Sequence, residues 1–304
     1  MSRTQSAQST QSMYTDRLAR LVQLSRDRHV FSFTRFDWVD DISDQDWWVS
    51  PELLTIHGTP YYEQASEAQR KLLSKWECIN LFSLNVTGEQ ELIAGVAELL
   101  HTPMLKEAND YLHHFIDEEN QHMWYFAKFC ENYAGKIYGN KKIQLTELKL
   151  DPRLTILVRF AQIFIFEEVG HYYNLKIALD DRVHPFIREI NEAHRNDESR
   201  HITFGRALLA RLADGISNDY APEVLGKVSQ HLRKYVQVTI ESLYNPAMYR
   251  DAGFSSGMAI RSALLNDPAR QDFHARELLK KVLALLGDTH LLKQETSLEP
   301  AYQS

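Results

Sequence analysis

Apolar residues recur at intervals of three and four positions along most of this 304-residue chain, which is the pattern of amphipathic α-helices. No stretch alternates convincingly between apolar and polar residues in the manner of a β-strand. Helices are expected to break near Pro103, Pro185 and Gly215, because proline and glycine interrupt them. The sequence therefore predicts an all-α fold, with long helices over about 66–100, 104–134, 152–180, 186–213 and 222–245, one near 14–28, and shorter ones after 255.

The composition argues against several classes of protein. Apolar residues make up 44% of the chain, which is enough for a sizeable core. A net charge of −7 without a long basic run argues against nucleic acid as a partner, and no apolar run approaches the ~18 residues that would indicate a membrane span. Two cysteines, Cys78 and Cys130, cannot form a disulfide framework, and the N-terminus lacks the apolar stretch of a signal peptide. The chain is therefore expected to be cytoplasmic, without a membrane as a partner.

The chain is expected to form a single domain. Residues 1–13 are rich in serine, glutamine and threonine, and are predicted to be a disordered tail. No internal linker or repeat divides the remainder, so residues 14–293 are predicted to form one helical domain, followed by a flexible tail over 294–304. Residues 30–64 are rich in aromatic side chains and lack helical periodicity. Such a segment is expected to wrap the core or a neighbouring subunit.

The spacing Glu-x-x-His, which places both side chains on one face of a helix, occurs four times. With 22 glutamates and 13 histidines in the chain, about one such pair would arise by chance. Each of the four therefore has to be weighed on its own helix. The pairs are Glu98/His101, Glu119/His122, Glu168/His171 and Glu198/His201.

The apolar stripe of each helix separates functional pairs from solvated ones. Glu119 and its partner His122 lie on the apolar stripe of their helix, where a carboxylate is costly unless it is paired or binds a metal. Glu98 and His101 lie at a helix end and are expected to be solvated. On that same helix, Glu89 lies within the apolar stripe and is expected to need a cation.

A third imidazole joins the last of the four pairs. His194, Glu198 and His201 fall on one narrow helix face, at positions i, i+4 and i+7. Two imidazoles and a carboxylate in this arrangement indicate metal ligands. Asp197 precedes Glu198 and is a candidate acceptor for the ring N–H of a ligating imidazole.

The helix predicted over 152–180 offers two alternatives. Glu167 and Glu168 both follow an apolar segment, and each shares a face with apolar residues. His171 neighbours either of them. Periodicity does not choose between the two glutamates.

Together, four long helices each place an acidic residue on an apolar face, and two of them add a Glu-x-x-His. This is the arrangement of a di-iron or di-manganese carboxylate centre between the four core helices of a ferritin-like bundle. Mixed carboxylate and imidazole ligands suit iron or manganese better than structural zinc, which prefers thiolate and imidazole. The sequence therefore predicts a buried centre of two metal ions.

The motifs resemble those of the p-aminobenzoate N-oxygenase (arylamine oxygenase) family of non-haem di-iron enzymes. The most specific is the His-x-x-Asp-Glu-x-x-His run, whose first histidine, His194, resembles an additional seventh ligand of that family. The family's spacing also selects Glu167 over Glu168. The matching segments are Gly88-Glu89-Gln90, Asp117-Glu118-Glu119-Asn120-Gln121-His122, Glu167, and His194-Arg195-Asn196-Asp197-Glu198-Ser199-Arg200-His201.

The resemblance implies a homodimeric helical bundle with two irons per chain, which manganese could replace, and no catalytic residues beyond the metal ligands. It implies a monooxygenase that uses dioxygen and an external electron donor. The implied reaction is the stepwise N-oxygenation of a small-molecule amine to hydroxylamine, nitroso and nitro products in secondary metabolism. The implied ligands are Glu89, Glu119, His122, Glu167, His194, Glu198 and His201.

Two other functions are alternatives. The same metals could support C–H hydroxylation or oxidation of a small or carrier-tethered substrate. A bundle of another class could store metal without catalysis, although storage would need a cage-forming assembly.

Overall fold

The computed structural model describes residues 3–139 and 148–292 of the chain. Within these ranges the regular structure is helical, and the only β-type pairing is an isolated bridge between Trp47 and Val183. The predicted all-α class is therefore confirmed. Four long helices form the centre of the molecule, namely α4 (Glu67–Ala97), α5 (Asn109–Ala134), α6 (Pro152–Leu179) and α7 (Pro185–Ala213).

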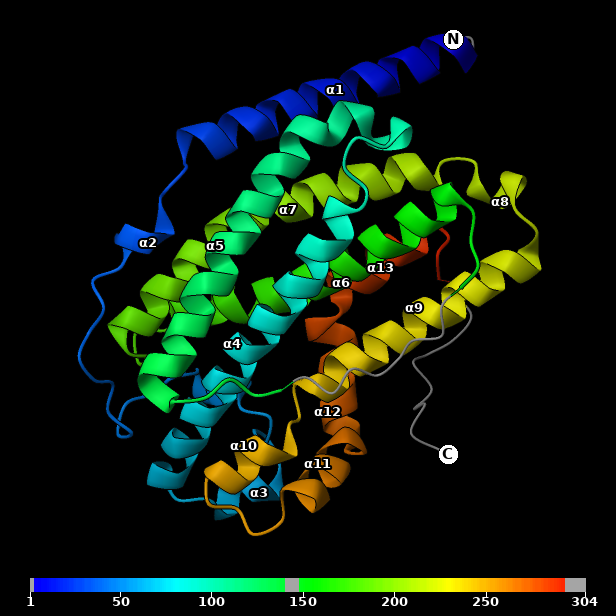
Figure 1. Cartoon of the computed structure of the whole chain (residues 1–304). Helices are drawn as coiled ribbons and strands as arrows, with labels where there is room; N and C mark the ends of the chain where they lie inside the picture. The colour runs from blue at the N-terminus through cyan, green and yellow to red at the C-terminus, as the bar shows by residue number, and fades with distance from the viewer. Residues whose placement is uncertain (1–2, 140–147, 293–304) are drawn as a thin grey trace.

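Shorter helices and two further long helices, α1 (Arg3–Asp27) and α9 (Pro222–Ser242), surround these four (Figure 1). The shorter ones are α2 (Ser32–Arg35), α3 (Pro60–Gln64), α8 (Ile216–Asp219), α10 (Pro246–Asp251), α11 (Gly257–Leu265), α12 (Pro268–Phe273) and α13 (Lys280–Asp288). Short 3-10 turns occupy Pro51–Leu53 and Pro103–Ala108, and a π-helical turn occupies His274–Leu278.

Side-chain caps and glycine define the ends of the central helices. The side chain of Ser66 accepts a hydrogen bond from the backbone of Gln69 at the start of α4, and Asp151 caps α6 in the same way. Proline occupies the first turn of α6 and of α7, where its missing N–H leaves no bond unmade. Gly135 ends α5 with a φ of 63°, a left-handed conformation that favours glycine.

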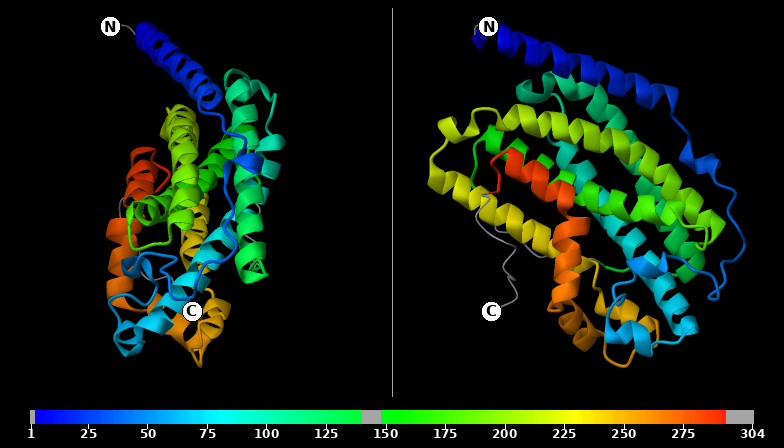
Figure 2. Two further views of the ribbon diagram at one scale, coloured as in Figure 1. Left: turned by 90° about the vertical axis from the view of Figure 1, so that its left-hand side faces the viewer. Right: turned by 180° about the vertical axis from the view of Figure 1, so that it is seen from behind.

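The central helices pack as two pairs, α4 along α5 and α6 along α7. Helix α1 lies across α5 and α7, while α9 and α13 pack against α6 on the other side of the molecule (Figures 1 and 2). Buried aromatic side chains fill the space between the pairs, which positions the inward faces of all four helices around one centre. The largest of them include Phe82, Phe115, Phe126, Phe129, Phe160, Phe164 and Phe204.

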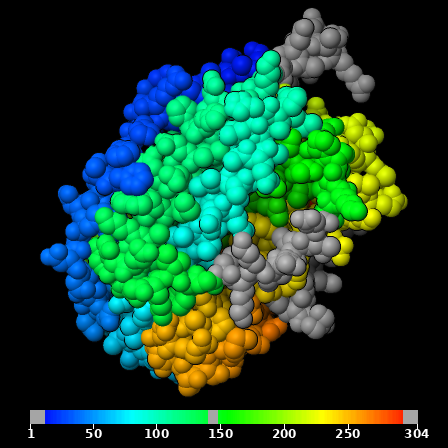
Figure 3. Space-filling view, in the orientation of Figure 1, coloured from blue at the N-terminus to red at the C-terminus, as the bar shows by residue number. Residues whose placement is uncertain are grey.

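The aromatic-rich segment before α4 covers the core. The ring of Phe36 is buried and lies 5.3 Å from that of Tyr125 on α5, and Phe33 lies 4.5 Å from Trp124. Figure 3 shows this N-terminal part of the chain, in blue, along the edge of α5 in green. Of the two roles expected for such a segment, the structure shows the wrapping of the chain's own core.

The first helix is longer than expected. Helix α1 begins at Arg3, so residues that were predicted to be a disordered tail over 1–13 are helical from Arg3 onward. The segment from Arg3 to Asp27 contains no proline or glycine, and a helix therefore meets no local break there. Residues 1–2 and the predicted tail over 294–304 lie outside the described residues, and the domain boundaries stay a prediction. No helix in the described ranges is both long and apolar enough to span a membrane.

Candidate metal centre

The seven predicted ligands come from the four central helices and meet in the core. Helix α4 contributes Glu89 and α6 contributes Glu167, while the other five come from α5 and α7. Every one of the seven is at most 3% exposed. Two groups have ligand atoms that all lie within 4.8 Å of one another, and they share His122: Glu119, His122, Glu198 and His201 form one group, and Glu89, His122 and His194 form the other.

Glu119 and Glu198 lie between two imidazoles. Nδ1 of His122 is 3.2 Å from Oε2 of Glu119 and 3.3 Å from Oε1 of Glu198. Nδ1 of His201 is 2.8 Å from the other oxygen of Glu119 and 3.4 Å from the other oxygen of Glu198. Two donors bound to one ion through bonds of about 2.1 Å at right angles would lie about 3 Å apart. One oxygen of each carboxylate thus faces His122 and the other faces His201, an arrangement that suits two adjacent ions.

His194 faces the same centre through its other ring nitrogen. Its Nε2 lies 3.0 Å from Oε1 of Glu198 and 3.6 Å from Oε1 of Glu89. The rings of His122 and His194 are 4.6 Å apart. The structure therefore groups His194 with Glu89 and His122, on one side of the centre.

Many polar atoms of the cluster are unpaired. Among the residues that the structure describes, neither oxygen of Glu89 or of Glu198 has a hydrogen-bond partner, and the same is true of Oε1 of Glu167. Buried polar groups are almost always hydrogen bonded, because an unmade bond costs about 1–3 kcal/mol or more for a charged group. Several unpaired oxygens that converge in one place fit metal cations, so the residues present suit a pair of hard or borderline ions.

The electrostatics of the cluster favour added positive charge. Burial raises the pKa of Glu89 to about 7. Burial and the negative charges of Glu198 and Glu119 raise the pKa of Glu167 well above its usual range. Burial opposes a charged imidazole at His122, yet the neighbouring carboxylates of Asp197, Glu119 and Glu198 raise its pKa well above the ordinary value. Bound cations would stabilise all these carboxylates in the ionised form.

Two further carboxylates orient the imidazoles from behind. Nε2 of His122 lies 3.2 Å from Asp197, as the sequence predicted for that aspartate, and Nε2 of His201 lies 2.7 Å from Glu118. Arg200 donates to both acids at 2.7 Å and thereby links the two contacts. An imidazole that donates its rear N–H to a carboxylate keeps its other nitrogen free for a metal.

Sequence spacing predicted no role for Glu118, although a signal was present. An acidic residue precedes the ligand glutamate in both Glu-x-x-His motifs, as Glu118 before Glu119 and Asp197 before Glu198. The two acids serve the histidine of the opposite helix, a relation that needs the packing of α5 against α7.

The two neighbouring glutamates of α6 have different surroundings. Glu168 accepts a hydrogen bond from Arg206 at 2.5 Å and lies 3.8 Å from Lys281, so its charge is already compensated. Glu167 lies beside Glu198 and Glu119 instead. Within the described residues, the buried Nδ1 of the half-buried His171 has no hydrogen-bond partner.

The pair expected to be solvated lies at the surface, away from the cluster. Glu98 is exposed and pairs with Arg159 at 3.4 Å. The ring of His101 contacts His113.

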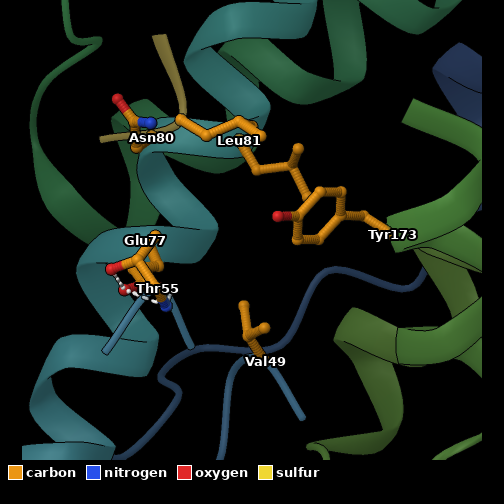
Figure 4. A pocket seen from close by; sticks show the side chains of 7 residues that line it. Val49, Thr55, Glu77, Asn80, Leu81 and Tyr173 are labelled. Carbon is orange, nitrogen blue, oxygen red and sulfur yellow. Dashed lines mark hydrogen bonds between the residues drawn. The ribbon is translucent and has the colours of Figure 1, made fainter. Parts of the chain in front are cut away.

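A second buried polar group lies on α4 outside the cluster. Glu77 accepts hydrogen bonds from the backbone N–H of Thr55 at 3.0 Å and from its hydroxyl at 2.6 Å. The Thr55 hydroxyl in turn accepts from Tyr249 at 2.8 Å. Glu77 and Thr55 border a cavity of about 20 Å³, toward which Tyr173 also points (Figure 4). A space of this size holds about one water molecule.

Comparison with known proteins agrees with the fold and the cluster. The model of the p-aminobenzoate N-oxygenase AurF family matches residues 11–290. No individual curated protein matches the chain.

Solved structures of R2-like ligand-binding oxidase are similar to the chain. A tyrosine-to-phenylalanine mutant with an aerobically reconstituted Mn/Fe cofactor has 14% identity and a TM-score of 0.54, over 91% of this chain and 93% of that chain. The same oxidase with an aerobically reconstituted Mn/Fe cofactor, after a long soak, has 13% identity and a TM-score of 0.53, over 91% and 92%. At these identities the likeness concerns the fold, which is that of a ferritin-like bundle. The family match, however, spans nearly the whole chain, so this protein belongs to the AurF family of p-aminobenzoate N-oxygenases and is a non-haem di-iron oxidoreductase.

Proposed function

We propose that the protein uses two irons per chain to transfer oxygen from dioxygen to the nitrogen of a small-molecule amine. The observation that carries the proposal is the cluster of unpaired carboxylate oxygens on four helices, in a chain whose family is named for N-oxygenation. An external reductant would supply the electrons. A homodimer in the cytoplasm remains part of the proposal.

All seven ligands together would hold the two ions. Glu119 and Glu198 each have one oxygen near His122 and the other near His201. Glu89 and His194 group with His122, and Glu167 lies beside Glu198 and Glu119.

Manganese is an alternative occupant of the same ligands. Carboxylate and imidazole ligands suit manganese as well as iron. The structurally similar R2-like ligand-binding oxidase carries a Mn/Fe cofactor. We therefore propose iron as the working metal and include manganese in the test.

Two irons, when reduced and bound, would supply the activation of dioxygen. The balanced first step consumes the amine, dioxygen, two electrons and two protons, and yields a hydroxylamine and water. The chain's own residues would hold the ions, exclude water and shape an apolar space beside them. Phe115 lies 4.3 Å from the ring of His201 and Phe126 lies 4.9 Å from that of His194, and both phenylalanines are buried.

The test is the fate of a labelled oxygen atom. The iron-loaded protein is given a reductant, ¹⁸O₂ and an aryl amine, and the products are identified by mass spectrometry. The proposal expects ¹⁸O on nitrogen, as hydroxylamine, nitroso or nitro product. Label on carbon would point to C–H hydroxylation, and no product from protein that retains iron would contradict an oxygenase acting on amines.

The manganese-loaded protein and an arylalkane of similar shape serve as matched controls. N-oxygenation by the manganese form alone would replace iron as the working metal. Oxidation of the arylalkane at a similar rate would contradict the specificity for nitrogen. A mass measurement that shows a dimer would also count against a cage-forming storage protein.

A further inference from the structure

The rear ring nitrogen of His194 has a different kind of partner from those of the other two imidazoles of the cluster. The rear nitrogens of His122 and His201 face the carboxylates of Asp197 and Glu118. Nδ1 of His194 instead contacts the side-chain amide of Asn174, which is 0% exposed. A carboxylate can only accept a hydrogen bond, whereas an amide can donate from its nitrogen or accept at its oxygen.

The orientation of this amide decides the tautomer of His194. Nδ2 of Asn174 faces Nδ1 of His194. An amide nitrogen can only donate, so in this orientation Nδ1 must accept, and a neutral ring then carries its proton on Nε2. Nε2 is the nitrogen that faces Glu198 and Glu89. A neutral imidazole that binds an ion through Nε2 must carry its proton on Nδ1, and its partner must then accept.

Asn174 has the means to accept. Its Oδ1 has no hydrogen-bond partner within residues 3–139 and 148–292. A half-turn of the amide about its terminal bond exchanges the nitrogen and the oxygen without moving the backbone. Asn174 also lies seven residues after Glu167, so both side chains project from the same face of α6.

We propose that Asn174 is a positioning residue for His194, and that its amide presents Oδ1 to Nδ1 when Nε2 binds an ion. The inference rests on the proposed function only in taking His194 as a ligand. It assigns the third imidazole a neutral orienting group, where the other two have charged ones. The amide therefore controls whether the seventh ligand is available to the metal.

The first test measures metal affinity by titration of the apoprotein with Co(II), followed by optical absorption. Asn174→Leu, which can neither donate nor accept, is expected to bind Co(II) about ten- to a hundredfold more weakly. Asn174→Asp, which can only accept, is expected to bind at least as tightly as the unmodified protein. Asn191 is a matched control, since it is also 0% exposed on a ligand helix but donates to the backbone of Ile187. Asn191→Leu is expected to change the affinity less than twofold.

A double variant separates positioning from packing. In His194→Ala protein, the further change Asn174→Leu is expected to leave Co(II) affinity within twofold, because its effect passes through the imidazole. An equal loss with and without His194 would overturn the proposal, and so would equal losses in the Asn174→Leu and Asn174→Asp proteins.

The second test needs no substitution at Asn174. In Zn(II)-loaded protein with ¹⁵N-labelled histidine, the resonances of His194 are identified by their loss in His194→Ala. The proposal expects the ring proton on Nδ1, and a proton on Nε2 would overturn it. Neither zinc nor cobalt binding depends on oxygenation, so this inference can fail while the iron protein still oxygenates an amine, and the reverse is equally measurable.

Discussion

Helix α4 carries two buried glutamates, Glu77 and Glu89, that share a raised pKa and differ in their hydrogen-bond partners and neighbouring segments. Burial raises the pKa of Glu77 and of Glu89 to about 7. Glu77 receives two hydrogen bonds from Thr55, whereas neither oxygen of Glu89 is paired in the described part of the chain. Helix α10 and the segment before α4 close around Glu77, whereas ligand residues of α5 and α7 converge on Glu89.

The contrast separates a structural carboxyl group from a ligand. A shifted pKa records burial at both positions and therefore identifies neither role. The hydrogen-bond partners identify the role, because a carboxylate that already accepts hydrogen bonds from the protein does not need a cation. We therefore expect that changes around Glu89 alter metal content, while changes at Glu77 alter stability alone.

The largest effect is expected from loss of a carboxylate at the middle of the cluster. Glu119→Ala removes one of the two carboxylates that lie between His122 and His201. Iron content is predicted to fall from about two per chain to near zero, with no detectable oxygenation. Elemental analysis and circular dichroism on one preparation check this. A folded Glu119→Ala protein that keeps both irons would contradict the assignment of Glu119 as a ligand.

A large but more selective effect is expected within α6. Glu167→Ala is predicted to weaken iron binding at least ~100-fold, beyond the usual effect of an orienting residue. Glu168→Ala should retain most metal and activity, because it removes an ion-pair partner of Arg206 and Lys281 rather than a ligand. Metal titration of the two proteins side by side gives the answer. Selective loss in Glu168→Ala would reverse the assignment.

The four ligand helices could be predicted because each has a local signature. An acidic residue at a position of the apolar stripe is visible from spacing alone, as it is for Glu89 and Glu119. Local spacing could not choose between Glu167 and Glu168, because both side chains are buried and α6 is covered on several sides. What distinguishes them is Arg206 and Lys281, which reach Glu168 from α7 and α13.

The residues behind the histidines could be predicted only in part. Asp197 was expected as an acceptor for an imidazole, since it adjoins Glu198 in the motif. Glu118 and Asn174 each contact a histidine on another helix, so their partners depend on how the helices pack rather than on local spacing. The hydrogen bonds of Glu77 join segments that are far apart in the chain, and no period in the sequence indicates them.

An intermediate effect is expected at His194, which differs from the other six ligands of the cluster. The other six ligands form a complete set for two ions, so His194→Ala should fold and still bind iron, with lower affinity. Oxygenation is predicted to fall at least ~10-fold, because an imidazole on one ion tunes its reactivity. Iron content, product from a single turnover and absorbance after mixing with oxygen are measured on one preparation. Unchanged turnover at full iron occupancy would remove His194 from the site.

The smallest effect on function is expected at Glu77, where the readout is stability against pH. Between about pH 4.5 and 7 the folded protein keeps a proton on Glu77 that the unfolded chain has lost. The free energy of unfolding therefore falls as the pH rises through this window, by about 3 kcal/mol. Glu77→Gln still accepts from Thr55 but cannot ionise, so it should remove this part of the decline and leave iron content unchanged.

Urea denaturation of metal-loaded protein at several pH values measures the effect. Bound metal holds Glu89 ionised, so the difference between the unmodified and Glu77→Gln proteins reports on Glu77. Identical pH profiles would mean that Glu77 does not hold a proton in the folded state, and lost iron would place it within the metal centre.

We infer that the buried cluster on α4, α5, α6 and α7 holds two irons. Elemental analysis of protein loaded with iron under anaerobic conditions and freed of unbound metal tests this directly. We expect about two irons per chain. A value near zero, or stoichiometric zinc that iron does not displace, would contradict it.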